Sequence, residues 1–190
     1  MKTRLLALST AVALTALMGA CSTTNPNVPT DAVAERQGIN ADVDGALTKL
    51  RTQMSGSDEL LRKARGVLVF PKVLSAGFVV GGSYGKGELR VGGQNAGYYS
   101  TTAASVGLLA GADSKAVYIL FMTDEALKKF QDSKGWTAGA DASVSVYKAG
   151  ANVGVDTQTV QQPIIGYALT NAGLMANVSF DGTKISRLDM

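Results

Sequence analysis

The sequence predicts an α+β domain in which N-terminal amphipathic helices pack on a curved, mainly antiparallel, glycine-rich sheet. Two observations support this fold class. Apolar residues follow a helical spacing before Gly66, whereas short β-branched and aromatic runs separated by glycines follow it. The chain has 22 glycines among its 190 residues, and a glycine inside a strand usually marks a bulge or a close approach of another backbone.

Two helices are predicted ahead of the sheet. The first covers residues 41–54 and is expected to begin after Asn40 as its N-cap. The second covers residues 58–65, is expected to be capped by Ser57, and ends at Gly66. The apolar residues of the first helix recur at the spacing of one helical face: Val43, Leu47, Leu50 and Met54.

The rest of the chain is predicted to be rich in strands, with one acid-led helix over residues 124–130 that Thr123 caps. Two segments, residues 76–84 and 172–180, resemble each other and are each followed by a polar turn. They suggest two related hairpins, although chance similarity between glycine-rich strands explains them equally well. The expected strands are residues 67–70, 77–84, 88–91, 116–121, 142–147, 151–155, 164–168, 174–180 and 184–188.

The N-terminus has the organisation of a bacterial export signal. Lys2 and Arg4 precede an apolar run over residues 5–18, which is followed by glycine, alanine and Cys21. This pattern resembles the lipobox of bacterial lipoproteins, in which the cysteine carries acyl chains and becomes the mature N-terminus. The alternative is an ordinary secretory signal that leaves a free thiol. Acylation explains why the protein has a single cysteine.

This interpretation divides the chain into a signal peptide over residues 1–20, an acylated tether over residues 21–30 and one domain over residues 31–190. Ser22, and not aspartate, follows the cysteine. In enteric-like bacteria this favours the outer membrane. We therefore expect a lipid-anchored protein of the cell envelope, at the outer membrane and facing the periplasm or the cell surface.

Composition argues against several classes of function. The chain has no histidine and one cysteine, so common metal centres and His-dependent catalysis lack their residues. Loss of Lys2 and Arg4 with the signal lowers the net charge of +3 by two, which argues against nucleic-acid binding. We expect no enzyme, no cofactor and no metal. A Ser-Lys or two-carboxylate site stays open, but no motif favours one.

Four basic residues flank the apolar stretch of residues 66–71, namely Arg62, Lys63, Arg65 and Lys72. A basic amphipathic helix that leads into apolar residues is typical of an interfacial membrane contact, with shallow insertion of its apolar face. The alternative, which the residues alone favour, is a solvated helix face whose leucines point into the core.

Seven ordered motifs between residues 40 and 188 resemble the SYLF-domain family, which is related to yeast actin-patch proteins. The motifs are residues 64–73 (ARGVLVFPKV), 76–82 (AGFVVGG), 85–87 (GKG), 105–108 (SVGL), 123–127 (TDEAL), 139–144 (GADASV) and 172–176 (AGLMA).

The resemblance implies a lipid-binding domain without enzymatic activity. Eukaryotic members bind phosphoinositides through an N-terminal amphipathic helix and basic residues, and some bind actin. In this chain, residues 40–65 would be that helix, and Arg62, Lys63, Arg65 and Lys72 would contact head groups. In a bacterial envelope the implied ligand is an anionic lipid or membrane surface. The rival interpretation is an interaction module for a protein partner, actin-like in a host.

Overall fold

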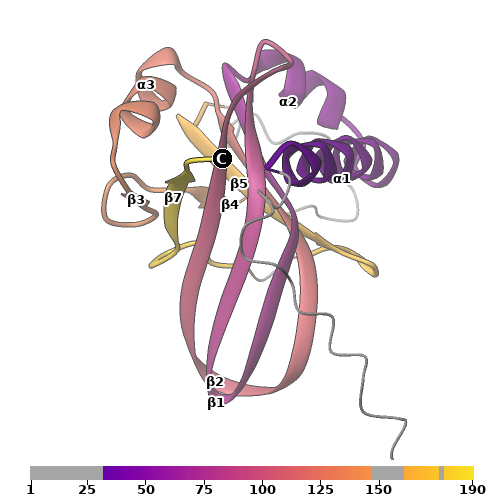
Figure 1. Ribbon diagram of the computed structural model, residues 1–190, viewed down its shortest axis with the longest axis vertical. Coiled ribbons are helices and arrows are strands. Elements are labelled where there is room, and N and C mark those ends of the chain that lie inside the picture. Colours follow the sequence, from indigo (N-terminus) through magenta and orange to yellow (C-terminus); the bar gives the residue numbers. More distant parts are fainter. Residues whose placement is uncertain (1–31, 147–160, 176–177) are drawn as a thin grey trace, which may run out of the picture. The chain divides into compact units, whose positions relative to one another are not determined.

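The computed structural model describes residues 32–146, 161–175 and 178–190, of which residues 78–79 and 105–112 are described by their backbone alone (Figure 1). It confirms the predicted α+β class. The described elements are α1 (Ala32–Gln53), α2 (Ser57–Lys63), β1 (Gly66–Val91), β2 (Gln94–Phe121), α3 (Asp124–Asp132), β3 (Trp136–Thr137), β4 (Ser145–Val146), β5 (Ile164–Thr170), β6 (Gly173–Leu174) and β7 (Lys184–Leu188).

The described strands form one sheet with the order β3-β7-β2-β5-β4, in which β1 pairs with β2 and β6 pairs with β5. The pairs are antiparallel except for β4 with β5. β5 pairs with the last part of β2, whereas β7 pairs with its first part. The two halves of β2 thus hold different neighbours.

The β1–β2 hairpin folds back on itself. Figure 1 shows the two strands running together to one end of the domain, bending there and returning. A Cβ atom on Gly87 would lie 2.1 Å from the carbonyl oxygen of Val69, so the second half of β1 lies against its first half. This fold-back curls the sheet, as the sequence predicts, and explains why glycine stands at the point of contact.

The polar turn predicted after the segment of residues 76–84, at residues 85–87, is wrong, because those residues lie inside β1. The three short strands expected over residues 67–91 are one continuous strand, and the turn falls at Gly92 and Gly93. Their φ angles of 59° and 80° suit a two-residue hairpin turn that L-residues with side chains rarely adopt. Gly85 and Gly87 allow the two halves of β1 to pack closely, and they do not reverse the chain.

The suggested pair of related hairpins is also wrong. Residues 76–84 belong to β1, whereas the described residues of the second segment contribute only the two-residue strand β6, which pairs with β5. Of the remaining expected strands, 164–168 and 184–188 are found in β5 and β7, and β4 lies within the described part of the strand expected over residues 142–147. The strand expected over residues 151–155 lies outside the described residues.

The helices differ from prediction mainly at their starts. α1 already includes Ala32, because residues 32–37 are mostly good helix formers, and Asn40 is therefore interior and not an N-cap. Gly56, with φ 81°, occupies the N-cap position of α2, and Ser57 is buried without capping it. α2 ends at Lys63 and not at Arg65. Thr123 caps α3 as predicted, since its hydroxyl accepts from the amide of Ala126 at 3.2 Å.

Apolar side chains cover both faces of the central strands. On one face, the apolar stripe of α1 packs on Val69, Tyr118 and Tyr167. On the other, α3 and β3 contribute Phe130 and Trp136 to a second cluster. Figure 1 shows α1 and α2 together on one side of the strands and α3 with β3 and β7 on the other.

The leucines of the predicted amphipathic helices therefore face the core. Leu47, Leu50 and Leu60 are buried, as the alternative interpretation of the basic helix expects. Membrane insertion by the apolar face of α1 is not available in this arrangement, because the sheet already occupies that face.

The described residues from Ala32 onward cluster into one compact unit. Among them, no helix combines the length and apolar character needed to cross a bilayer. Cys21 and the predicted signal and tether lie outside the described residues.

Candidate anion-binding site

α1 has a hollow along each of its flanks. Asp42, Ala46 and Lys49 line the first hollow, which we call the lysine pocket. Leu47 and Arg51 line the second, which we call the arginine groove. Residues three and four apart share one side of a helix. Asp42, Ala46 and Lys49 therefore share one side of α1, and Leu47 and Arg51 share the opposite side. α1 therefore separates two sites of different chemistry.

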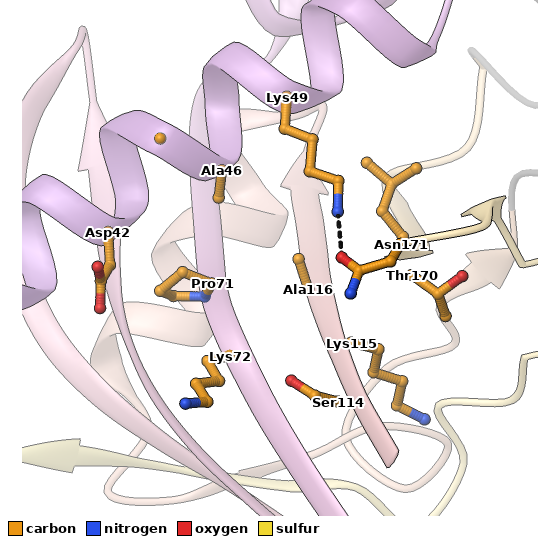
Figure 2. Close-up of a pocket in the computed structure, with 12 residues that line it drawn as sticks. Asp42, Ala46, Lys49, Pro71, Lys72, Ser114, Lys115, Ala116, Thr170 and Asn171 are labelled. Atoms are coloured by element: carbon orange, nitrogen blue, oxygen red, sulfur yellow. Dashed lines mark hydrogen bonds between the residues drawn. The ribbon is translucent and has the colours of Figure 1, made fainter.

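The lysine pocket has a volume of about 300 Å³ and lies between α1 and the sheet (Figure 2). Three elements besides α1 contribute to it: the first half of β1, the second half of β2 and the end of β5. Its lining residues are Asp42, Gly45, Ala46, Lys49, Pro71, Lys72, Ser114, Lys115, Ala116, Leu169, Thr170 and Asn171.

A β-bulge places Lys72 at this pocket. Phe70 pairs with Val117, but the next pair is Val73 with Lys115, so Pro71 and Lys72 together oppose a single residue of β2. A bulge suits proline, which has no amide hydrogen to donate to the ladder. The same register brings Lys115 level with the residue after Lys72.

The lysines of the pocket are not neutralised by carboxylates. Lys49 Nζ donates to Asn171 Oδ1 at 3.1 Å. Lys72 and Lys115 make no hydrogen bond or ion pair among the described residues, and Asp42 pairs with neither. In Figure 2, Lys49 reaches down to Asn171, whereas the amines of Lys72 and Lys115 point to opposite sides. The charges thus flank the pocket and do not converge on one atom.

The four basic residues predicted from the sequence do not form one cluster. Arg62, Lys63 and Arg65 lie at the junction of α2 with β1, whereas Lys72 is about 20 Å further along the strand, given a rise of roughly 3.3 Å per residue. Lys63 pairs with Glu59 at 2.6 Å and Arg65 with Asp124 at 3.5 Å. The structure places Lys72 beside the lysine pocket instead.

Sequence reasoning missed Lys49 and Lys115 as neighbours of Lys72. Lys49 lies on the flank of the predicted first helix, and Lys115 directly precedes a predicted strand. No sequence pattern joins them, because their proximity depends on the bulge, the strand register and the position of α1.

An ion-pair network at the other flank fixes α1 to β1. Arg90 donates to both carboxylate oxygens of Glu88, at 3.1 and 3.2 Å, and to Asp44 of α1 at 2.6 Å. Glu88 is 1% exposed. Burial by itself would lower the pKa of Arg90, but the hydrogen bonds to Glu88 and Asp44 outweigh it and raise that pKa. Arg90 therefore has a structural role in holding α1 against β1.

Among the described residues, no group of three or more acidic side chains is placed to hold a metal ion. The lysine amines of the described residues donate to carboxylates and to one side-chain amide, and none donates to a serine hydroxyl.

The second half of the chain matches a known protein family. A family model described as "Ysc84: Las17-binding protein actin regulator" matches residues 102–189. Residues 102–189 are therefore similar to the Ysc84 family. This match confirms the resemblance to the SYLF domain. The Ysc84 segment runs from β2 to β7 and includes Lys115 and Asn171 of the lysine pocket, whereas α1, α2 and β1 precede it. The comparison with curated proteins gives no match.

Proposed function

We propose that this Ysc84-family domain binds anionic lipid head groups without catalysis, through the lysine pocket. The observation that carries the proposal is a set of three lysines around one hollow, two of which have no described partner. A lysine near an anionic membrane surface contributes about 1 kcal/mol. Several anionic head groups spread across a bilayer suit charges that flank the pocket.

The proposed contact is electrostatic. The apolar stripe of α1 is buried against the sheet, so the charged flanks of the helix, and not its apolar face, are available to a membrane. Such a contact would be weak alone and would act together with acyl chains on Cys21, because stable anchoring generally needs two signals. We accordingly propose a lipoprotein held at the cell envelope, at the outer membrane.

A protein partner is the second candidate. The Ysc84 family is described by Las17 binding and actin regulation. In this chain, Val80 and Tyr84 of β1 are 65% and 48% exposed, as is much of Leu74. Large apolar side chains that are exposed on a strand favour a protein contact over a head-group contact.

Vesicle cosedimentation tests the proposed function. We would use the full chain with Cys21→Ser, and compare neutral vesicles with vesicles that contain phosphatidylglycerol. The triple variant Lys49→Gln, Lys72→Gln and Lys115→Gln should bind anionic vesicles about a hundredfold more weakly, at about 1 kcal/mol per lysine. Neutral vesicles report any binding that the predicted signal peptide contributes.

The matched control changes three lysines outside the pocket: Lys128→Gln, Lys134→Gln and Lys184→Gln. It alters net charge equally and should keep most of the binding. Equal losses in the two triple variants, or no preference for anionic vesicles, would contradict the proposal. A further variant, Arg62→Ser, Lys63→Ser and Arg65→Ser, measures what the α2 junction contributes.

A further inference from the structure

The arginine groove is a second hollow, separate from the lysine pocket and bounded by α1, α2 and the turn of the β1–β2 hairpin. Its volume is about 640 Å³, which lies within the range of roughly 300–1,000 Å³ usual for small-molecule sites. It is lined by Asp44, Leu47, Thr48, Arg51, Leu61, Arg62, Ala64, Val67, Arg90, Gly92 and Gly93.

Aliphatic side chains line part of this groove. Leu47 and Val67 are 7% and 9% exposed and belong to the cluster beneath α1, and the half-buried Leu61 packs against that cluster. An extended hydrocarbon chain would cover what remains exposed of these side chains and would itself leave water, which is favourable in proportion to the apolar area removed.

The rim of the groove carries three arginines, and they differ in availability. Arg90 is held by Glu88 and Asp44. Arg51 pairs with Asp58, but both side chains are about half exposed, at 47% and 60%, so water and other anions compete for that pair. Arg62 makes no hydrogen bond or ion pair among the described residues, although Glu59 lies near enough for the charge of Arg62 to lower the pKa of its carboxyl, after the larger effects of Lys63.

We infer that the arginine groove binds a long-chain aliphatic carboxylate, with Arg62 at the carboxylate and the hydrocarbon chain along Leu47, Leu61 and Val67. A planar guanidinium matches a carboxylate with two parallel hydrogen bonds. One available guanidinium beside an aliphatic wall suits a single charge at the end of an apolar chain. The three amines of the lysine pocket offer a different chemistry, so this site does not depend on the proposed head-group contact.

A fluorescent fatty acid tests the inference. The full chain with Cys21→Ser is titrated with dansyl-undecanoic acid, and oleate is then added as competitor. Arg62→Gln should weaken binding about tenfold, as expected for loss of one charge-assisted pair. Lys63→Gln is the matched control, because Lys63 is the next residue and does not line the groove. It should leave the affinity unchanged.

Two further measurements separate the groove from other apolar sites, including the predicted signal peptide. Thr48→Phe places a large side chain at the groove, whereas Thr52→Phe makes the same change one turn along α1, outside the lining. Only the first should reduce binding. The triple lysine variant should keep its affinity for the fatty acid even if it loses vesicle binding.

Three results would overturn the inference. They are equal affinity for methyl oleate and oleate, equal losses in Arg62→Gln and Lys63→Gln, and displacement of the probe by an acidic aliphatic peptide but not by oleate. The last result would assign the groove to a protein partner. Circular dichroism of each variant ensures that a loss of binding is not a loss of fold.

Discussion

Two buried tyrosines place their hydroxyl groups in contrasting surroundings. Tyr118 donates to the carbonyl oxygen of Ala46 at 2.8 Å, and burial raises its pKa to about 12. Burial also raises the pKa of Tyr99, against the opposing effect of Arg187, yet its hydroxyl has no hydrogen-bond partner among the described residues. A buried polar group without a partner costs free energy, whereas a bonded one contributes modestly.

We therefore expect opposite effects when phenylalanine replaces these tyrosines. Tyr99→Phe should leave the free energy of unfolding unchanged or raise it by up to about 1 kcal/mol, and Tyr118→Phe should lower it by about 1 kcal/mol. Urea unfolding followed by circular dichroism measures both. A clear loss in Tyr99→Phe would mean that its hydroxyl does have a partner.

Glycine residues of β1 also differ in how much space a side chain would have at their positions. A Cβ atom at Gly87 would lie 2.1 Å from the carbonyl oxygen of Val69, whereas at Gly82 its nearest such neighbour is the carbonyl oxygen of Ala103 at 3.9 Å. Gly87→Ala should destabilise the fold by at least about 2 kcal/mol through overpacking. Gly82→Ala should be neutral or stabilising by about 0.5–1 kcal/mol, because glycine weakens a strand. Thermal unfolding distinguishes them, and equal midpoints would contradict the fold-back of β1.

At the scale of elements, the attachment of α1 to the sheet decides where both candidate sites lie. Its apolar stripe packs on the central strands, and polar contacts fix its position along them. Arg90 joins Asp44 of α1 to the buried Glu88, and the side-chain amide nitrogen of Asn40 donates to the hydroxyl of Tyr98 at 3.0 Å. α1 therefore holds Lys49 and Arg51 at set positions on its two flanks.

The Glu88 pair should behave as a buried ion pair. Arg90→Met leaves the carboxylate of Glu88 buried without its main partner, and should lower the free energy of unfolding by about 3–5 kcal/mol. The double variant with Glu88→Leu removes that charge and should recover part of the loss. Urea unfolding of the two single variants and the double variant gives the coupling energy. Additive losses would show that Glu88 and Arg90 act independently.

At the scale of the whole molecule, the local arrangement of charged side chains matters more for binding an anionic surface than the net charge does. The chain carries 18 basic and 15 acidic residues, and many acidic groups are engaged with basic neighbours, as in Lys129 with Glu125 and Lys86 with Glu35. The lysine pocket differs in that three lysines without such pairs lie around one hollow. A membrane contact would therefore depend on where the unpaired charges lie.

Binding to anionic vesicles and binding of the fatty acid should depend differently on salt concentration. Raising ionic strength from 0.1 to 1 M shortens the screening length from about 10 to about 3 Å. Binding to anionic vesicles should then fall by at least about tenfold, whereas binding of the fatty acid, which is largely apolar, should change by less than about threefold. Titrations at both salt concentrations measure this. Vesicle binding that resists salt would point to apolar insertion and against the electrostatic contact.

The sequence by itself determined the α+β class, the apolar stripe of the first helix, the Thr123 cap of α3 and the resemblance to the SYLF family, because these depend on local periodicity, capping chemistry and ordered motifs. Tertiary structure decided that β1 is one strand whose second half folds back to contact its first half at Gly87, and that Lys72 joins Lys49 and Lys115 while Arg62 borders a different hollow. Strand register, a bulge and the position of α1 bring such residues together, and no short stretch of sequence encodes those long-range contacts.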